Sequence, residues 1–186
     1  MLLDMPAPTD GASAAAPSAD AASAADRPAI DPDLFRSVLG RFASGVTVVT
    51  GRDPAGRDHG MTVSAFCSVS LDPPLVLVCI DRAATMHDHL VEGAPFVVNV
   101  LAGAQEALSR RFAAGDPPDR FGGVGYHRGA LGVAVLDDTL AHLECRVAAR
   151  HPGGDHTIVV GRVEGAATSE ARPLLYYRSG YASLER

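Results

Sequence analysis

The chain has 186 residues, 47% of them hydrophobic and 20% charged, which favours one globular domain with a short extra segment. Its formal net charge is −6 and all 16 basic residues are arginine, so nucleic-acid binding, Schiff-base lysine chemistry and a P-loop lysine are excluded. No apolar run approaches the ~18–20 residues of a membrane span, and the N-terminus lacks a secretory signal. We therefore expect a cytoplasmic protein with neither a membrane nor a nucleic-acid partner.

The first 29 residues are mostly Ala, Ser, Pro and Asp. Such a segment buries too little apolar surface to offset the entropy of ordering, so we predict a disordered tail over residues 1–29. A single domain is expected over residues 30–186. Within it, Cys67 and Cys79 lie in apolar runs and are interpreted as small buried residues.

Order is expected to begin with a helix, because Asp31 suits an N-cap and Pro32 a first helical turn. Apolar residues then recur at helical spacing and predict an amphipathic helix packed on another element. They are Leu34, Phe35, Val38, Leu39 and Phe42.

Most of the remaining segments resemble strands. Residues 46–50, 61–70, 75–80, 95–101, 141–148 and 157–163 are β-branched, apolar or alternating, and short helices are expected at 85–91 and 104–112. Many connections are too short for repeated parallel crossovers. The pattern therefore predicts a mainly β fold, a closed or nearly closed antiparallel barrel with short peripheral helices.

Familiar nucleotide and hydrolase motifs are missing. The nearest match to G-x-G-x-x-G, at residues 123–128, ends in Arg128, and neither G-x-S-x-G nor H-E-x-x-H occurs. A nucleotide would have to be bound without a Rossmann fingerprint.

Two segments could hold a flat, phosphorylated ligand. Residues 60–65 combine small side chains with hydroxyls, which lets a ring approach the backbone, although ordinary strand threonines and serines look the same. Residues 79–85 run from a strand into a helix with Arg82 and Thr85 at the junction, an arrangement that suits either a phosphate or a plain helix cap.

Three further features stay open on the residues alone. Ser109 and Arg111 end a predicted helix and suit either an anion or the helix dipole. His156 follows a glycine turn that either aims it at a pocket mouth or leaves it exposed. The tyrosines near the C-terminus, Tyr181 among them, suit either stacking on the ring of a ligand or completing the hydrophobic core. His87 and His89 suggest a metal, but no third ligand is identifiable, which favours surface histidines.

Six segments, in this order, resemble the flavin reductase-like family, the small partners of two-component flavin monooxygenases. They are 35–50 (FRSVLGRFASGVTVVT), 60–78 with Pro73 and Pro74, 96–100 (FVVNV), 108–113 (LSRRFA), 154–156 (GDH) and 173–178 (PLLYYR). The resemblance implies an FMN-binding split β-barrel, usually a homodimer with flavin near the subunit interface.

The resemblance also implies the site. Its cofactor-binding residues are Gly60, Met61, Thr62, Val63, Ser64 and Ala65 at the flavin ring, Cys79, Ile80, Asp81, Arg82, Ala83, Ala84 and Thr85 at the phosphate, Ser109 and Arg111 beside them, and His156, Arg178 and Tyr181 on the nicotinamide side. His156 is the catalytic candidate, and no metal is expected.

The implied activity is NADH- or NADPH-dependent reduction of FMN or FAD by hydride transfer, with reduced flavin diffusing to a separate monooxygenase component. Hydride transfer is cofactor chemistry that needs positioning rather than a protein nucleophile. The alternatives are a flavoprotein that retains FMN as an oxidase or dehydrogenase, a non-catalytic flavin or haem carrier, and a domain that reduces a metal complex or quinone.

Overall fold

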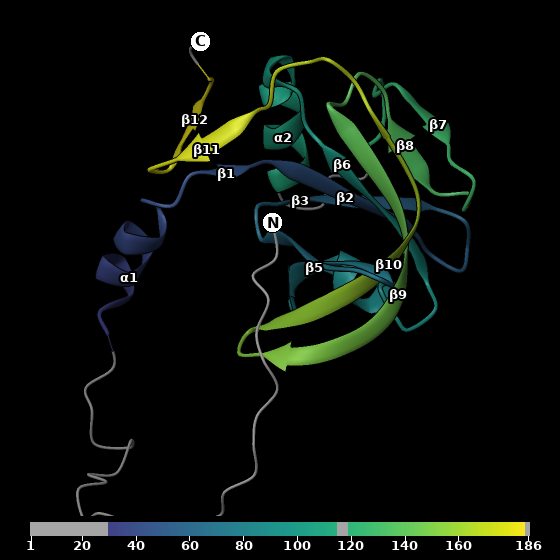
Figure 1. Ribbon diagram of the computed structural model, residues 1–186, viewed down its shortest axis with the longest axis horizontal. Coiled ribbons are helices and arrows are strands. Elements are labelled where there is room, and N and C mark those ends of the chain that lie inside the picture. The colour runs from purple at the N-terminus through teal and green to yellow at the C-terminus, as the bar shows by residue number, and fades with distance from the viewer. Residues whose placement is uncertain (1–29, 115–118, 185–186) are drawn as a thin grey trace, which may run out of the picture.

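The computed structural model describes residues 30–114 and 119–184, so the predicted tail at 1–29 lies outside the described residues. These residues form a mainly β structure with short helices (Figure 1). The helical elements are α1 (Pro32–Leu39), the 3₁₀ turns η2 (Thr85–His89) and η3 (Gly103–Gln105), and α2 (Glu106–Ala113). The strands are β1 (Ser44–Gly45), β2 (Thr47–Arg52), β3 (Asp58–Val63), β4 (Phe66–Leu71), β5 (Pro74–Asp81), β6 (Pro95–Val100), β7 (Tyr126–Arg128), β8 (Ala134–Leu136), β9 (Ala141–Gly153), β10 (His156–Thr168), β11 (Leu175–Tyr177) and β12 (Gly180–Ala182).

The main sheet has seven antiparallel strands in the order β3-β2-β6-β9-β10-β5-β4. Consecutive strands β3 and β4 therefore occupy its two opposite edges, joined only by Ser64 and Ala65. In a flat sheet of seven strands these edges would lie about 29 Å apart. Since the chain from Val63 to Phe66 reaches at most about 11 Å, the sheet has to curl until its edges nearly meet.

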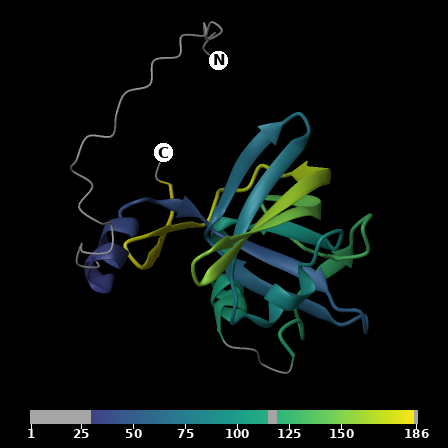
Figure 2. The ribbon, with the colours of Figure 1, turned by 90° about the horizontal axis from the view of Figure 1, so that it is seen from below.

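The curled sheet is not closed by hydrogen bonds between its edge strands (Figure 2). The mainly β class and the short peripheral helices expected from the sequence are confirmed, and the barrel is split at the seam between β3 and β4. Apolar side chains inside the curl form the main core, including Val78, Ile80, Phe96 and Val98. A second core, with Val48, Leu101 and Phe112, holds α2 against the outside of β2 and β3.

Several elements differ from their predicted extents. The stretch 61–70 is two strands rather than one, because the chain leaves one sheet edge at Ser64 and enters the other at Phe66. β9 and β10 run several residues beyond the alternating segments, since each is paired with the other along nearly its whole length. The helix expected at 85–91 is the shorter 3₁₀ turn η2.

The first helix forms where it was expected, but its apolar side chains are not packed on another element of the chain. Asp31 caps α1 through its Oδ1, which accepts from the Asp33 N–H at 3.2 Å. Within the single chain α1 has no buried residue, so its apolar face is open. Cys67 was expected to be buried and is exposed instead, because it lies on the edge strand β4.

No helix among the described residues is both long enough and apolar enough to cross a membrane.

Gly60 controls how closely α2 approaches the sheet. A Cβ added there would lie 2.7 Å from Phe112 Cε1, and Phe112 is 1% exposed. We expect Gly60→Ala to lower the free energy of unfolding by about 1–3 kcal/mol, because the buried ring has to shift. Urea unfolding followed by circular dichroism measures this change. Gly45→Ala is the matched control, since its Cβ would meet nothing within 4 Å, and an equal loss in both variants contradicts the packing argument.

Candidate functional site

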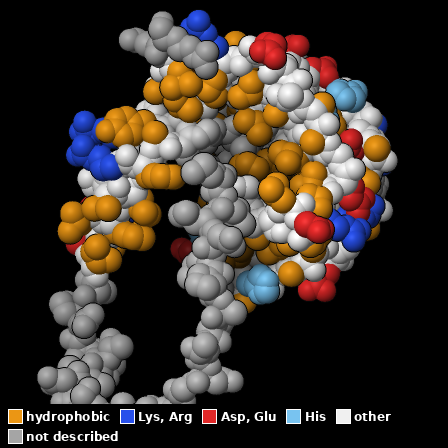
Figure 3. All heavy atoms as spheres, viewed as in Figure 1, with side chains coloured by type: hydrophobic (Ala, Val, Ile, Leu, Met, Phe, Trp, Pro, Cys, Tyr) orange, Lys and Arg blue, Asp and Glu red, His pale blue; other side chains and the backbone are white. Residues whose placement is uncertain are grey.

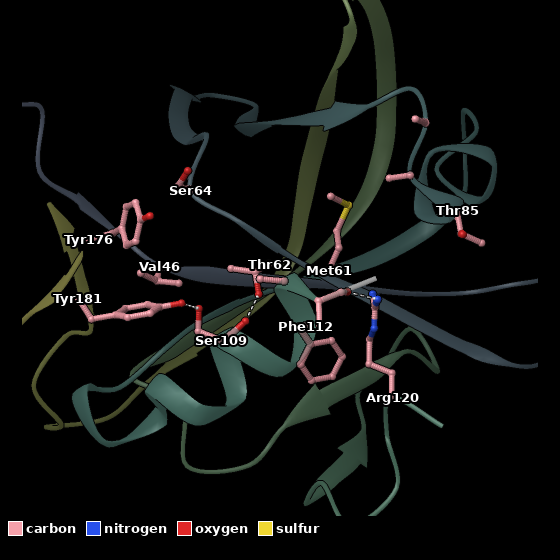
Figure 4. Close-up of a pocket in the computed structure, with 14 residues that line it drawn as sticks. Val46, Met61, Thr62, Ser64, Thr85, Ser109, Phe112, Arg120, Tyr176 and Tyr181 are labelled. Atoms are coloured by element: carbon pink, nitrogen blue, oxygen red, sulfur yellow. Dashed lines mark hydrogen bonds between the residues drawn. The ribbon is translucent and has the colours of Figure 1, made fainter. Parts of the chain in front are cut away.

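A pocket of about 580 Å³ opens at the seam of the barrel, within the range of small-molecule sites (Figure 4). Its walls come from the end of β3 with Ser64, the segment after β5, the end of α2, and the strands β11 and β12. Val46, between β1 and β2, and Arg120, in the loop after α2, complete the lining. Its lining residues are Val46, Met61, Thr62, Ser64, Ala83, Ala84, Thr85, Ser109, Phe112, Ala113, Ala114, Arg120, Tyr176 and Tyr181.

Hydroxyl groups link three of these parts. Thr62 Oγ1 donates to the Ser109 carbonyl at 2.7 Å, and Ser109 Oγ shares a hydrogen bond of 2.8 Å with the Tyr181 hydroxyl. Ser109 is fully buried, so its satisfied hydroxyl fixes α2 relative to both β3 and β12. This chain of bonds holds one wall of the pocket in place.

Aromatic rings form one side of the pocket. The rings of Tyr176 and Tyr181 pack edge to face with centroids 5.4 Å apart, and the Arg110 guanidinium lies 4.7 Å from the Tyr181 ring centroid. A hydrogen bond from Arg110 to the Glu106 carboxylate raises the pKa of Arg110, so this cation is permanent. Planar rings in this arrangement suit contact with another planar group.

A cation lies on the other side of the pocket, opposite Tyr181 in Figure 4. Arg120 donates to the carbonyls of Gly60 and Ala114, which tie it to β3 and to the end of α2. Among the lining residues it is the one that carries a formal charge. An anionic part of a ligand would find its electrostatic partner at this end.

The segment after β5 makes a tight turn into the pocket. Asp81 Oδ1 accepts from the Ala83 N–H at 2.8 Å, and the Asp81 carbonyl accepts from the Ala84 N–H at 3.1 Å. The turn presents Ala83, Ala84 and Thr85 to the pocket, while the exposed Arg82 lies outside the lining.

His156 lies beside this turn rather than in the pocket. It pairs with Asp81 across β10 and β5, and the Asp155 carbonyl accepts from the Arg82 N–H at 3.1 Å. His156 Nδ1 and Asp155 Oδ1 are 2.7 Å apart, and this hydrogen bond lowers the pKa of Asp155. Asp155 therefore orients an imidazole near the rim.

The structure brings together part of the predicted set. The predicted residues that line the pocket are Met61, Thr62, Ser64, Ala83, Ala84, Thr85, Ser109 and Tyr181. Those outside its lining are Gly60, Val63, Ala65, Cys79, Ile80, Asp81, Arg82, Arg111, His156 and Arg178.

Several of the outlying residues have other partners. Val63 and Ile80 belong to the barrel core. Arg111 donates to the Gly122 carbonyl at 2.6 Å, so it braces the loop after α2. Arg178, with a φ of 50°, lies against the end of α1, where its N–H donates to the Gly40 carbonyl.

Sequence reasoning missed six lining residues: Val46, Phe112, Ala113, Ala114, Arg120 and Tyr176. Phe112 and Tyr176 stand in segments that the sequence singled out, so their apolar or aromatic character next to Ser109 and Tyr181 was an available signal. Arg120 lies in a loop rich in Gly, Asp and Pro, with no periodicity to mark it.

The lining is chemically simple. It contains hydroxyls, small apolar residues, aromatic rings and one arginine, and no carboxylate, imidazole or thiol is among its residues. Burial raises the pKa of Cys145 to about 12, so that thiol remains protonated in the core. The arrangement suits the binding and orientation of a planar cofactor better than acid–base or nucleophilic catalysis.

Comparison with known proteins agrees with this geometry. Residues 39–185 match the family model described as the flavin reductase like domain. An NADH-dependent flavin reductase of Rhodococcus is 47% identical over 161 residues, 85% of this chain and 89% of the relative. The reductase subunit HsaB of a flavin-dependent monooxygenase of Rhodococcus jostii is 41% identical, covering 89% of this chain and 84% of the relative. The solved NADH:FAD oxidoreductase SgcE6 of Streptomyces globisporus, in complex with NAD and FAD fragments, has a TM-score of 0.78 at 36% identity and covers 86% of this chain and 98% of its own.

Proposed function

Because the chain belongs to the flavin reductase-like domain family, we propose that it transfers hydride from NADH to a flavin held in the seam pocket. The observation that carries the proposal is the lining itself, which offers a planar ligand hydroxyls, rings and one cation but no acid–base or nucleophilic side chain. When bound, flavin supplies the redox chemistry, accepting a hydride and passing electrons on after release.

The chemistry of the pocket residues supports a flavin as the ligand. Thr62 and Ser64, on and beside β3, offer hydroxyls and backbone groups to the edge of a ring, and Tyr181 offers an aromatic surface. Thr85 and Arg120 line the part of the pocket that suits a phosphate, since arginine forms charge-assisted hydrogen bonds with phosphate oxygens. The exposed Arg82, next in sequence to the lining residue Ala83, is proposed as a second cation for the phosphate.

The protein's contribution to the reaction is positioning. The buried hydrogen bonds around Ser109 keep β3, α2 and β12 in fixed relation, so a ring between them is held in one orientation. His156, oriented by Asp155, is proposed to contact the nicotinamide cofactor at the rim. Near-attack geometry, rather than a protein proton donor, then lowers the barrier.

NADH is the proposed reductant, since several relatives are named NADH-dependent. For the flavin, the neighbour solved with FAD fragments supports FAD, and FMN fits the same pocket chemistry. Relatives that are reductase components of monooxygenases support an oxygenase partner, supplied here by diffusing reduced flavin.

The activity is tested by NADH oxidation with the purified full chain. We expect rapid oxidation only when FMN or FAD is added, with flavin behaving as a dissociable substrate. A protein that stays yellow through gel filtration and gains nothing from added flavin would instead be a flavin-retaining oxidase or carrier.

A homodimer is proposed to cover the open apolar face of α1. Figure 3 shows hydrophobic side chains gathered over α1, which stands away from the barrel. Leu34, Phe35, Val38 and Leu39 are each about half exposed. On the edge strand β4, Leu71 is 95% exposed. An amphipathic helix with an unburied stripe and an unpaired apolar edge strand both favour a second copy of the chain as their partner.

Removing the pocket cation should weaken flavin binding. We expect Arg120→Ala to raise the flavin Kd by roughly tenfold or more, as for loss of a charge-assisted hydrogen bond, while hydride transfer at saturating flavin changes less. Arg82→Ala tests the rim in the same way. Flavin fluorescence titration gives both constants, with the exposed Arg172→Ala as control. Unchanged Kd values in both variants would remove the phosphate assignment.

His156→Ala is expected to raise the KM for NADH several-fold while the flavin Kd stays near that of the unchanged chain. The reason is its place beside the turn at Asp81, outside the flavin lining. Stopped-flow reduction of bound flavin at varied NADH measures this split. His151→Ala, an exposed histidine on the same hairpin, is the control. Equal half-saturation in His156→Ala and His151→Ala would place His156 outside the site.

A charge on the apolar face of α1 should break the proposed dimer. We expect Phe35→Asp to shift the mass seen by sedimentation velocity from two chains to one, because it puts a carboxylate into an apolar contact. Arg36→Gln, on the polar side of the same helix, should leave the mass unchanged. A wild-type protein that sediments as one chain at micromolar concentration contradicts the proposal.

A further inference from the structure

Outside the lining of the seam pocket, a carboxylate and two imidazoles lie close together at the end of η2 that carries His89. Asp53, His59 and His89 each offer one ligand atom, and these three atoms all lie within 4.8 Å of one another. His59 Nε2 and Asp53 Oδ2 are 3.1 Å apart, and the two imidazole centroids are 4.2 Å apart. The cluster joins residues distant in sequence, which explains why the sequence showed no third ligand for His89.

Hydrogen bonds and burial restrict the movement of these side chains. The Asp53 N–H donates to the Arg57 carbonyl at 2.9 Å across the tight turn between β2 and β3, and the Arg57 N–H donates to Asp53 Oδ1 at 2.8 Å. The Asp53 side chain is only 3% exposed and that of His59 only 20%. His89 comes from η2, whose other histidine, His87, points elsewhere and contacts Thr157 Oγ1 at 2.9 Å.

We propose that Asp53, His59 and His89 form a binding site for a divalent transition-metal ion such as Zn²⁺. Two imidazole nitrogens and one carboxylate oxygen are a ligand set that Zn²⁺ and neighbouring borderline ions favour, with water completing the coordination. Bonds of about 2.0–2.1 Å place the ligand atoms of a tetrahedral site about 3.4 Å apart. His59 and Asp53 are already that close, and the most widely spaced pair has to approach by at most about 1.4 Å. Hard ions such as Mg²⁺ prefer all-oxygen ligands and would bind poorly.

The surroundings of His89 and Asp53 agree with the geometry of the cluster. Burial, together with the neighbouring His59, lowers the pKa of His89, which favours the neutral ring that binds metals. Asp53 remains a carboxylate, because hydrogen bonds from Arg57 and His59 outweigh its burial and hold its pKa far below the usual value.

A metal ion would replace the contact between His59 Nε2 and Asp53 Oδ2, and it would also have to compete with the Arg57 side chain for the carboxylate. Arg57 Nε donates to Asp53 Oδ2 at 2.8 Å, but the Arg57 side chain is 77% exposed and can turn into solvent. The backbone N–H of Arg57 keeps Oδ1 in place when the side chain moves. A metal would therefore displace an ion pair whose cation is exposed to solvent rather than one buried on both sides.

The test is calorimetric titration of the chelator-treated full chain with ZnCl₂, and with MgCl₂ as control ion. We expect one equivalent of Zn²⁺ to bind, binding to be lost in His59→Ala and His89→Ala, and His151→Ala to bind normally. Arg57→Gln should bind Zn²⁺ roughly two- to fivefold more tightly, because an exposed like charge has been removed. A purely structural Asp53–His59 pair predicts no such gain.

A second measurement uses the unchanged chain, so it tests the proposal even if the histidine variants do not fold. Electron paramagnetic resonance of the unchanged chain with one equivalent of Cu²⁺ should show coupling to two imidazole nitrogens. The proposal is overturned if no stoichiometric Zn²⁺ binding occurs, if both histidine variants still bind it, or if the Cu²⁺ spectrum lacks the two nitrogens. None of these measurements depends on flavin or NADH.

Discussion

The two-residue connection through Ser64 and Ala65 is the constraint on which the rest of the structure depends. It joins strands at opposite edges of a seven-stranded sheet, so the sheet can form only if it curls. Backbone pairing stops where the chain crosses from β3 to β4, and the pocket opens at this point, with Ser64 in its lining. The same crossing leaves β4 with an unpaired edge and exposed apolar side chains within the single chain.

The electrostatics of the pocket follow from which elements meet at the seam. β3 contributes hydroxyls, α2 contributes a buried serine and the ring of Phe112, and the C-terminal strands contribute tyrosines. Among the described lining residues none is a carboxylate, and Arg128 and Asp58, which form an ion pair, both lie outside the lining. A flavin gains negative charge when it is reduced. A lining whose one formal charge is the Arg120 guanidinium would therefore suit both redox states of the proposed ligand, with no carboxylate among the lining residues to repel the reduced one.

The sequence predicted local structure well wherever one interaction dominated. Asp31 and Pro32 mark the start of α1 because capping depends on neighbouring residues only. The apolar positions Cys145 and Val147 of the alternating segment lie in the main core of the barrel, as alternation predicts. The break at Ser64 was invisible, since small and hydroxyl residues suit a strand and a crossing equally. Cys67 was misjudged because burial depends on whether a strand has a neighbour, which is a property of topology rather than of composition.

The site was predicted only as far as its segments carried recognisable patterns. Thr62, Ser64, Thr85, Ser109 and Tyr181 were found through such patterns, whereas Arg120 reaches the pocket from an irregular loop through bonds to two carbonyls. Residues such as Val63 and Ile80 shared those segments but face the core, because successive side chains of a strand point to opposite faces. A resemblance that covers whole strand segments therefore predicts about twice as many site residues as the pocket-facing side of those strands can contain.

The turn η2 connects the two sites argued above. Thr85 at its start lines the seam pocket, and His89 at its end faces Asp53 and His59. Its five residues leave little room for one end to move without the other. A cation held by His89 and a flavin held beside Thr85 would act on the same short element. If binding of the cation changes the affinity for flavin by some factor, binding of flavin must change the affinity for the cation by the same factor.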